Sequence, residues 1–217
     1  MKFLYDFDNC IMKGDITEGF PNNYIGIPEY LYAIGKANTS IYKTFQDYNE
    51  TYYLQEKKFN TDAYTFPLSI TDENSSIYIN EYWESTLKNY INQKVKKLIE
   101  RQSKYGEIWI ITASPTLFVK PIQKYIPEIV NVVGIDKDEI ISYSQGKLSR
   151  ILSILSPEQI GGFTGETWIN DGPLLSYLRN YNKCNDKLRF INHGQIDKNT
   201  KKNLMLYNIR IINTDLY

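Results

Sequence analysis

The sequence predicts an α/β protein with a doubly wound, mostly parallel sheet and an inserted, mostly helical cap. Short apolar runs rich in β-branched or aromatic residues alternate with segments of helical period. This alternation is typical of parallel strands joined by crossover helices. In addition, residues 8–106 separate the first apolar run from the second, and one crossover helix needs far fewer residues. The interval must therefore contain an element of its own.

Four runs have the length and composition of strands, and a fifth is weaker. The four are "KFLYDF" (2–7), "EIWIITAS" (107–114), "IVNVVGI" (129–135) and "LRFINH" (188–193), and the weaker one is "TWIND" (167–171). Valine, isoleucine and the aromatic residues fit a pleated, packed surface better than most residues do. We therefore expect these runs to form the sheet.

The helical segments between the runs have apolar residues at three- and four-residue spacings. In "ESTLKNYINQKVKKLIERQSKYG" (84–106) the apolar residues form one stripe and the segment ends at Gly106. The other three segments are "PTLFVKPIQKYI" (115–126), "GKLSRILSIL" (146–155) and "NTKKNLMLYNI" (199–209). Each segment is expected to pack its apolar face on the sheet.

Residues 16–82 are rich in aromatic residues and low in the branched aliphatic residues of the expected sheet. Within them, "PEYLYAIGKA" (28–37) and "YKTFQDYNETYYLQEKKF" (42–59) have the character of helices. We therefore expect residues 1–15 and 83–217 to form the α/β core, and residues 16–82 to form the inserted helical cap.

The composition argues against several partners. The 217 residues include 25 Lys and Arg against 25 Asp and Glu, so no overall positive field would attract nucleic acid or an anionic membrane. Two cysteines do not make a disulfide framework, and the N-terminus lacks the apolar region of a signal peptide. We expect a cytoplasmic protein without nucleic-acid or membrane partners, whose oligomeric state the sequence leaves open.

Acidic, amide and hydroxyl side chains follow the expected strands. They are Asp6 and Asp8 after the first, Thr112 and Ser114 at the end of the second, and Glu166, Asn170 and Asp171 around the weak one. The carboxyl ends of parallel strands lie at one edge of a sheet, where ligands bind. Paired carboxylates with a further acid suit Mg²⁺, which prefers oxygen ligands. An isolated Asp-x-Asp, however, more often forms a turn stabilised by its own side chain.

Four segments resemble, in order, the motifs of the haloacid dehalogenase (HAD) superfamily. "DFDNCI" resembles its Asp-x-Asp-x-Thr/Val motif, "IWIITASP" its second motif, "SQGKLSRIL" its lysine motif and "GETWINDGPLL" its last acidic motif. The segment "LRFINHGQIDKNTKKNLMLYNIRII" is similar to the tail of the phosphoserine phosphatase-like branch. The resemblance covers the expected core, implies a HAD-like Rossmannoid fold, and leaves the cap unmatched.

The resemblance implies a phosphatase that hydrolyses a small phosphomonoester through an aspartyl phosphate. Asp6 would attack phosphorus, and Asp8 would act as general acid and then as general base. Thr112 would donate a hydrogen bond to a phosphoryl oxygen, and Lys147 would neutralise charge on the phosphoryl group and on Asp6. Ser114, which precedes Pro115, is interpreted as a helix N-cap. The alternative is a phosphate-binding or regulatory protein with little turnover, which the irregular last motif favours.

The same resemblance implies that Mg²⁺ is held by Asp6, by the backbone carbonyl of Asp8 and by an acid of the last motif. If Trp168 is an inserted residue, Glu166 is that acid, and we prefer this alignment. Without the insertion, the direct ligand is Asp171 and Glu166 is a solvated loop residue. Cys10 occupies a position that the family usually fills with Thr or Val.

Three further observations bear on the site. Lys120, the competing candidate for the catalytic lysine, is interpreted as a solvated helix residue. His193, the single histidine, is interpreted as a turn residue because no second histidine or cysteine pair accompanies it. No arginine precedes Arg101, so the cap lacks a guanidinium to hold a carboxylate, which argues against phosphoserine as the substrate.

Overall fold

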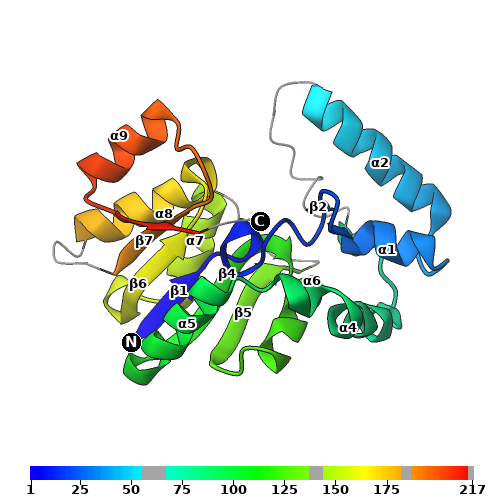
Figure 1. Ribbon diagram of the computed structural model, residues 1–217, viewed down its shortest axis with the longest axis horizontal. Coiled ribbons are helices and arrows are strands. Elements are labelled where there is room, and N and C mark those ends of the chain that lie inside the picture. The colour runs from blue at the N-terminus through cyan, green and yellow to red at the C-terminus, as the bar shows by residue number, and fades with distance from the viewer. Residues whose placement is uncertain (55–66, 137–143, 182–186, 215–217) are drawn as a thin grey trace.

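The core is a six-stranded sheet in the order β5-β4-β1-β6-β7-β8, seen in the computed structural model (Figure 1). The structure describes residues 1–54, 67–136, 144–181 and 187–214. The strands are β1 (Lys2–Tyr5), β4 (Glu107–Pro115), β5 (Ile129–Ile135), β6 (Ile160–Gly165), β7 (Leu188–Asn192) and β8 (Arg210–Asn213). All five pairings between neighbouring strands are parallel. The predicted doubly wound α/β class is confirmed.

Helices cover both faces of the sheet. The helices of the core are α5 (Gln93–Gln102), α6 (Thr116–Val119), α7 (Gln145–Ile154), α8 (Trp168–Tyr181) and α9 (Lys198–Leu206). Successive side chains of a strand point to opposite faces. Accordingly Phe3 and Tyr5 pack with α5 and α6 in one apolar cluster, whereas Leu4 packs with α7, α8 and α9 in the other.

The predicted strand at residues 167–171 is wrong. These residues lead into α8, and the strand is the preceding segment "IGGFTG", which forms β6 between β1 and β7. Three glycines lower the strand propensity of this segment. The central position requires small residues, since a Cβ added at Gly162 would lie 2.6 Å from the carbonyl oxygen of Lys187. Close packing therefore requires glycines in β6, and these glycines hide the strand in the sequence.

The segment 84–106 is not one helix. The helix α4 (Ser75–Ser85) ends before a 3₁₀ turn at Leu87–Tyr90, and α5 begins after Asn92. The Asn92 side chain accepts hydrogen bonds from the amides of Lys94 and Val95 at 3.1 and 3.3 Å. The backbone of residues 90–92 instead pairs with the loop that follows β1: Lys13 N donates to Tyr90 O and Asn92 N donates to Ile11 O, both at 2.8 Å. The expected helix is therefore interrupted at residues 90–92, whose backbone binds the loop that bears Asp6 and Asp8.

The remaining helix predictions hold in part. Residues 146–155 and 199–209 correspond to α7 and α9. In segment 115–126, by contrast, α6 is short and is followed by a 3₁₀ turn at Lys120–Lys124 that contains Pro121. Proline lacks a backbone N–H and clashes with the preceding turn of an α-helix. Pro121 therefore prevents α6 from continuing as an α-helix.

The described part of residues 16–82 is mostly helical. It contains an antiparallel pair, β2 (Gly19–Phe20) and β3 (Tyr24–Ile25), followed by α1 (Ile27–Ala33), α2 (Thr39–Leu54) and the first part of α4. The predicted helices at 28–37 and 42–59 correspond to α1 and α2, although residues 55–59 lie outside the described residues. Figure 1 shows α1 and α2 away from the sheet, beyond the strand edge that bears β5. Within the described ranges, no helix has both the length and the apolar character needed to cross a bilayer.

Candidate active site

The loop after β1 is held in one conformation by its own backbone. Asp6 N donates to Thr164 O of β6 at 2.9 Å, which ties the start of the loop to the neighbouring strand. Asn9 has φ 52° and ψ 5°, the left-handed region that asparagine tolerates better than most residues. Its amide donates to Gly14 O at 3.0 Å, and Met12 N donates to Phe7 O at 3.0 Å. The loop therefore turns sharply directly after the two aspartates.

A buried lysine joins two of the predicted site carboxylates. Lys147, in the first turn of α7, has no exposed surface, and its Nζ lies 2.9 Å from Asp6 Oδ1 and 2.6 Å from Asp171 Oδ1. Burial disfavours the charge of Lys147, but Asp171 and Asp6 outweigh this effect and raise its pKa. The ammonium group therefore stays protonated between the two carboxylates.

Asp171 has both carboxylate oxygens engaged. Besides the ion pair of Oδ1 with Lys147, Oδ2 accepts hydrogen bonds from the amides of Glu166 and Thr167 at 2.7 and 3.2 Å. The Glu166 side chain is half-buried, and its carboxylate accepts a hydrogen bond from the Thr167 hydroxyl. Asp171 thus shapes the loop after β6, whereas Glu166 lies on that loop.

Asp8 is held by the end of β4. Its Oδ1 accepts a hydrogen bond from Ile16 N at 2.8 Å, and its Oδ2 accepts one from the Ser114 hydroxyl and lies 3.5 Å from Thr112 Oγ1. The interpretation of Ser114 as a helix N-cap is wrong, because α6 has no side-chain cap and Ser114 binds Asp8. Hydroxyls two residues apart on a strand share a face, a signal that could have revealed this role.

Among the described residues of the site, carboxyl groups outnumber ammonium groups. Burial raises the pKa of Asp6 to about 7, helped by Asp171 and opposed by Lys147. Burial also raises the pKa of Glu166 to about 7, opposed by the Thr167 hydroxyl, and raises that of Asp8 well above its usual range, helped by Asp15. Among the described residues, Lys147 pairs with Asp6 and Asp171, and Asp8, Asp15 and Glu166 are further acids that interact electrostatically with one another or with this pair. A bound cation would lower the electrostatic cost of these acids.

The oxygen donors around Asp6 suit Mg²⁺ better than they suit a metal ion whose ligands are all side chains. Within the described part of the chain, no three Asp, Glu, His or Cys side chains form a ready-made metal cluster. Mg²⁺ usually takes one or two carboxylates together with waters and substrate phosphate oxygens. The groups expected to hold the metal, Asp6, Glu166 and the backbone carbonyl of Asp8, are oxygen donors of the type that Mg²⁺ takes.

Solved structures share this architecture, although no family model and no curated protein matches the sequence. A phosphoserine phosphohydrolase-like protein from Francisella tularensis is 15% identical, with a TM-score of 0.53 over 98% of this chain and 95% of that one. The chain has the HAD-like fold. A protein of unknown function from Bordetella pertussis Tohama I matches with a TM-score of 0.73 at 14% identity, over 99% and 98% of the two chains. Cytosolic 5'-nucleotidase IIIB bound to cytidine matches at 8% identity with a TM-score of 0.53, over 100% and 80%.

The HAD-like core brings the expected residues to one edge of the sheet. Lys147 is in direct contact with both Asp6 and Asp171, and Thr112 lies beside Asp8. Asn170 has a different place, because its Oδ1 accepts a hydrogen bond from Ser144 N at 3.0 Å and so holds the start of α7. Lys120 is exposed, in agreement with its interpretation as a solvated residue.

Cys10 is compatible with its position in the loop. Its side chain is buried, and Sγ lies 3.8 Å from Thr164 O, to which the thiol donates. Burial and the neighbouring carboxylates, Asp6 first among them, raise the pKa of this thiol well above its usual range. Cys10 is therefore a neutral packing residue that joins the loop to β6.

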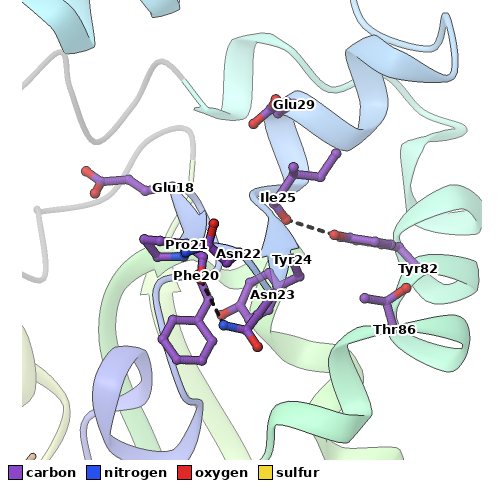
Figure 2. Close-up of a pocket in the computed structure, with 10 residues that line it drawn as sticks. All are labelled: Glu18, Phe20, Pro21, Asn22, Asn23, Tyr24, Ile25, Glu29, Tyr82 and Thr86. Atoms are coloured by element: carbon purple, nitrogen blue, oxygen red, sulfur yellow. Dashed lines mark hydrogen bonds between the residues drawn. The ribbon is translucent and has the colours of Figure 1, made fainter. Parts of the chain in front are cut away.

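A cavity of about 580 Å³ lies between the β2–β3 hairpin, α1 and α4 (Figure 2). The Tyr82 hydroxyl crosses one side of it and donates to Ile25 O at 2.9 Å. Glu18 and Glu29 contribute to its lining, and none of the described residues that line it is a lysine, arginine or histidine. The described lining therefore offers no positively charged side chain to a phosphate group, in contrast to the surroundings of Lys147.

Gly165 permits the close approach of Asp171. A Cβ added at Gly165 would lie 2.6 Å from the Cβ, Cγ and Oδ2 atoms of Asp171, so Gly165→Ala must displace this carboxylate. We expect it to lower the free energy of unfolding by about 1–3 kcal/mol, measured by urea denaturation. Gly194→Ala is the control, because no heavy atom lies within 4 Å of its added Cβ. Equal stabilities of the two variants would contradict the tight packing of Asp171.

Proposed function

We propose that this protein is a Mg²⁺-dependent phosphomonoester hydrolase that acts through an aspartyl phosphate at Asp6. The observation that carries the proposal is the buried ammonium group of Lys147, held between Asp6 and Asp171. A fully buried lysine is rare unless it is paired. Here it lies beside the predicted nucleophile, where it can neutralise the charge of an incoming phosphoryl group. The order of the four motifs in the sequence supports the same function.

In the first half-reaction, a carboxylate oxygen of Asp6 attacks phosphorus, and the bond from phosphorus to the ester oxygen breaks. The Asp8 carboxyl group donates its proton to the leaving oxygen, so that an alcohol departs. Because Ile16 N and the Ser114 hydroxyl hold the two oxygens of Asp8, the acid is positioned before the substrate binds. Positioning of this kind accounts for much of the catalysis of phosphoryl transfer.

In the second half-reaction, water attacks the phosphorus of the aspartyl phosphate, and Asp8 accepts a proton from this water. The bond from phosphorus to the Asp6 oxygen breaks, which releases inorganic phosphate, frees the Asp6 carboxylate and leaves Asp8 protonated again. Lys147 and the Thr112 hydroxyl would stabilise the negative charge on the phosphoryl oxygens in both steps. When bound, Mg²⁺ would supply further neutralisation of that charge.

We assign the metal-holding groups to Asp6, the backbone carbonyl of Asp8 and Glu166. Asp171, the other acid of the last motif, is already engaged by Lys147 and by two amides. It would therefore position Lys147 and the loop rather than bind the metal directly. This arrangement supports the alignment in which Trp168 is an inserted residue.

Two matched variants test this assignment. We expect Glu166→Gln to raise the Mg²⁺ concentration needed for half-maximal activity by at least about tenfold, because a direct ligand loses its charge. We expect Asp171→Asn to lower the unfolding midpoint in EDTA, because Lys147 then keeps one charged partner instead of two. Activity titrations with Mg²⁺ and thermal melts measure the two effects. A larger shift in Mg²⁺ requirement for Asp171→Asn than for Glu166→Gln would contradict the assignment.

We further propose that residues 16–82 are a cap that selects the leaving group, and that residues 1–15 and 83–217 are the catalytic core. Support comes from α1 and α2, which lie away from the sheet (Figure 1). Stacked tyrosine pairs, Tyr30–Tyr82 and Tyr32–Tyr42 with ring centroids 4.0 and 4.2 Å apart, stabilise the helices of this region. The absence of arginine before Arg101 disfavours a substrate with a free carboxylate near the phosphate.

The proposed function is tested by hydrolysis of para-nitrophenyl phosphate in Mg²⁺ and in EDTA. We expect turnover that requires the metal. A panel of phosphoserine, nucleoside monophosphates and sugar phosphates then tests the cap, and we expect phosphoserine not to be the best substrate. If no phosphomonoester is hydrolysed while Mg²⁺ still binds, the protein is a phosphate-binding or regulatory protein and the hydrolase proposal fails.

A further inference from the structure

The single histidine contacts the loop that bears the proposed nucleophile. His193 lies in the bend after β7, its Nε2 contacts the carbonyl oxygen of Asn9, and its Nδ1 lies 2.7 Å from Thr214 Oγ1. A carbonyl oxygen only accepts hydrogen bonds, so Nε2 must carry the hydrogen of the neutral ring. Nδ1 then accepts the hydrogen bond of the Thr214 hydroxyl. Burial lowers the pKa of His193, which favours this neutral form.

Asn9 is the residue whose conformation turns the loop after Asp8. Its left-handed φ of 52° is rare for a residue with a side chain. The amide of Asn9 belongs to the same peptide group as the Asp8 carbonyl, and it donates to Gly14 O at 3.0 Å. The Asn9 carbonyl belongs to the next peptide group, and His193 binds it. The two contacts thus fix the peptide groups on both sides of Asn9.

His193 is itself anchored by the far strands of the sheet. Thr214 follows β8, is buried, and its amide donates to Asn192 O of β7 at 2.9 Å. Asn192 Nδ2 donates to Asn213 Oδ1 at 2.8 Å, and Gly194 N donates to Asn192 Oδ1 at 3.1 Å. These bonds hold the bend that carries His193 against the ends of β7 and β8. The ring therefore links the C-terminal strands to the catalytic loop.

We propose that His193 is a positioning residue of the active site: it holds the Asn9 peptide, and so the backbone carbonyl and carboxyl group of Asp8, in the reactive geometry. Since the roles of Asp8 are part of the proposed function, the catalytic consequence rests on that function. The hydrogen bond from His193 to the Asn9 carbonyl, which tethers the loop, does not depend on the proposed function. Groups that orient a metal ligand typically affect metal affinity or activity by about 10–100-fold.

Two substitutions separate the hydrogen bond from the bulk of the ring. His193→Phe keeps a planar ring without a donor, and His193→Gln keeps a side-chain N–H that can reach the Asn9 carbonyl. For His193→Phe we expect kcat for para-nitrophenyl phosphate to fall about 10–100-fold with little change in KM. We also expect faster hydrogen–deuterium exchange in peptides that cover residues 8–13. His193→Gln should recover much of both properties.

The two readouts distinguish a failure of the tether from a failure of the proposed function. Wild-type exchange of residues 8–13 and wild-type kcat in His193→Phe would overturn the inference. So would equal losses in His193→Phe and His193→Gln. Faster loop exchange in a chain whose wild type hydrolyses no phosphomonoester would confirm the tether and overturn the proposed function. If His193→Phe does not fold, Thr214→Val removes only the hydroxyl that fixes the ring, and we expect it to change both readouts in the same direction.

Discussion

Replacement of Asp6 by asparagine is expected to lower kcat for phosphomonoester hydrolysis by about four orders of magnitude or more. The amide cannot attack phosphorus as a carboxylate does, so the covalent step is lost. The side chain keeps its shape, and Lys147 keeps its ion pair with Asp171 at 2.6 Å. The fold should therefore survive the substitution. Steady-state hydrolysis of para-nitrophenyl phosphate in Mg²⁺ measures the loss of activity.

Glu100→Gln makes the same carboxylate-to-amide change on the exposed surface of α5, outside the proposed cap, and is the matched control. It should retain wild-type turnover. Circular dichroism of the two variants should match that of the wild type. If a well-folded Asp6→Asn variant keeps turnover within about tenfold of the wild type, a covalent role for Asp6 is excluded, because that difference corresponds to only about 1.4 kcal/mol of activation free energy.

Replacement of Lys147 by methionine is expected to lower the free energy of unfolding by about 3–5 kcal/mol. The ammonium group is fully buried between the carboxylates of Asp6 and Asp171. Its removal leaves two buried carboxylates close together without their shared counter-ion. Methionine has a similar length and fills the space, so the loss of stability reports on charge rather than on a cavity. Urea denaturation in EDTA measures it without a contribution from bound metal.

Lys120→Met provides the control for the same change of side chain at an exposed position. We expect its stability to lie within about 0.5 kcal/mol of the wild type, as for most surface substitutions. The Lys147 variant should also lose activity, because the phosphoryl charge is no longer neutralised. Equal stabilities for the two methionine variants in EDTA would show that Lys147 does not bridge two ionised carboxylates.

The sequence predicts the sheet well where strands are made of branched and aromatic residues. The segments that became β1, β4, β5 and β7 are such runs. It fails at β6, where glycines are required by the close approach of neighbouring backbone and side chains. Packing of that kind depends on the tertiary structure and leaves no periodic signal. The prediction therefore displaced the strand into the start of α8.

For the site, too, residues in local motifs could be predicted, whereas contacts that depend on the tertiary structure could not. Asp6, Lys147 and Asp171 could be proposed because their motifs are local, and in the structure Lys147 contacts the other two. Ser114 was missed because a hydroxyl before proline is typical of a helix cap. The contact of His193 with Asn9 joins residues 184 positions apart, and no pattern in one sequence connects them. The break in the helix at Asn92 likewise depends on its pairing with the loop after β1.

Trapping the covalent intermediate tests most directly whether Asp6 is the nucleophile. The protein would be mixed with para-nitrophenyl phosphate and Mg²⁺, quenched in acid during turnover and reduced with borohydride, which converts an aspartyl phosphate to homoserine. Tandem mass spectrometry then locates the reduced residue. We predict homoserine at position 6 in the presence of substrate, and none in its absence or in Asp6→Asn. Sustained turnover with no modified residue at position 6, or with the modification at another aspartate, would contradict the assignment of Asp6 as nucleophile.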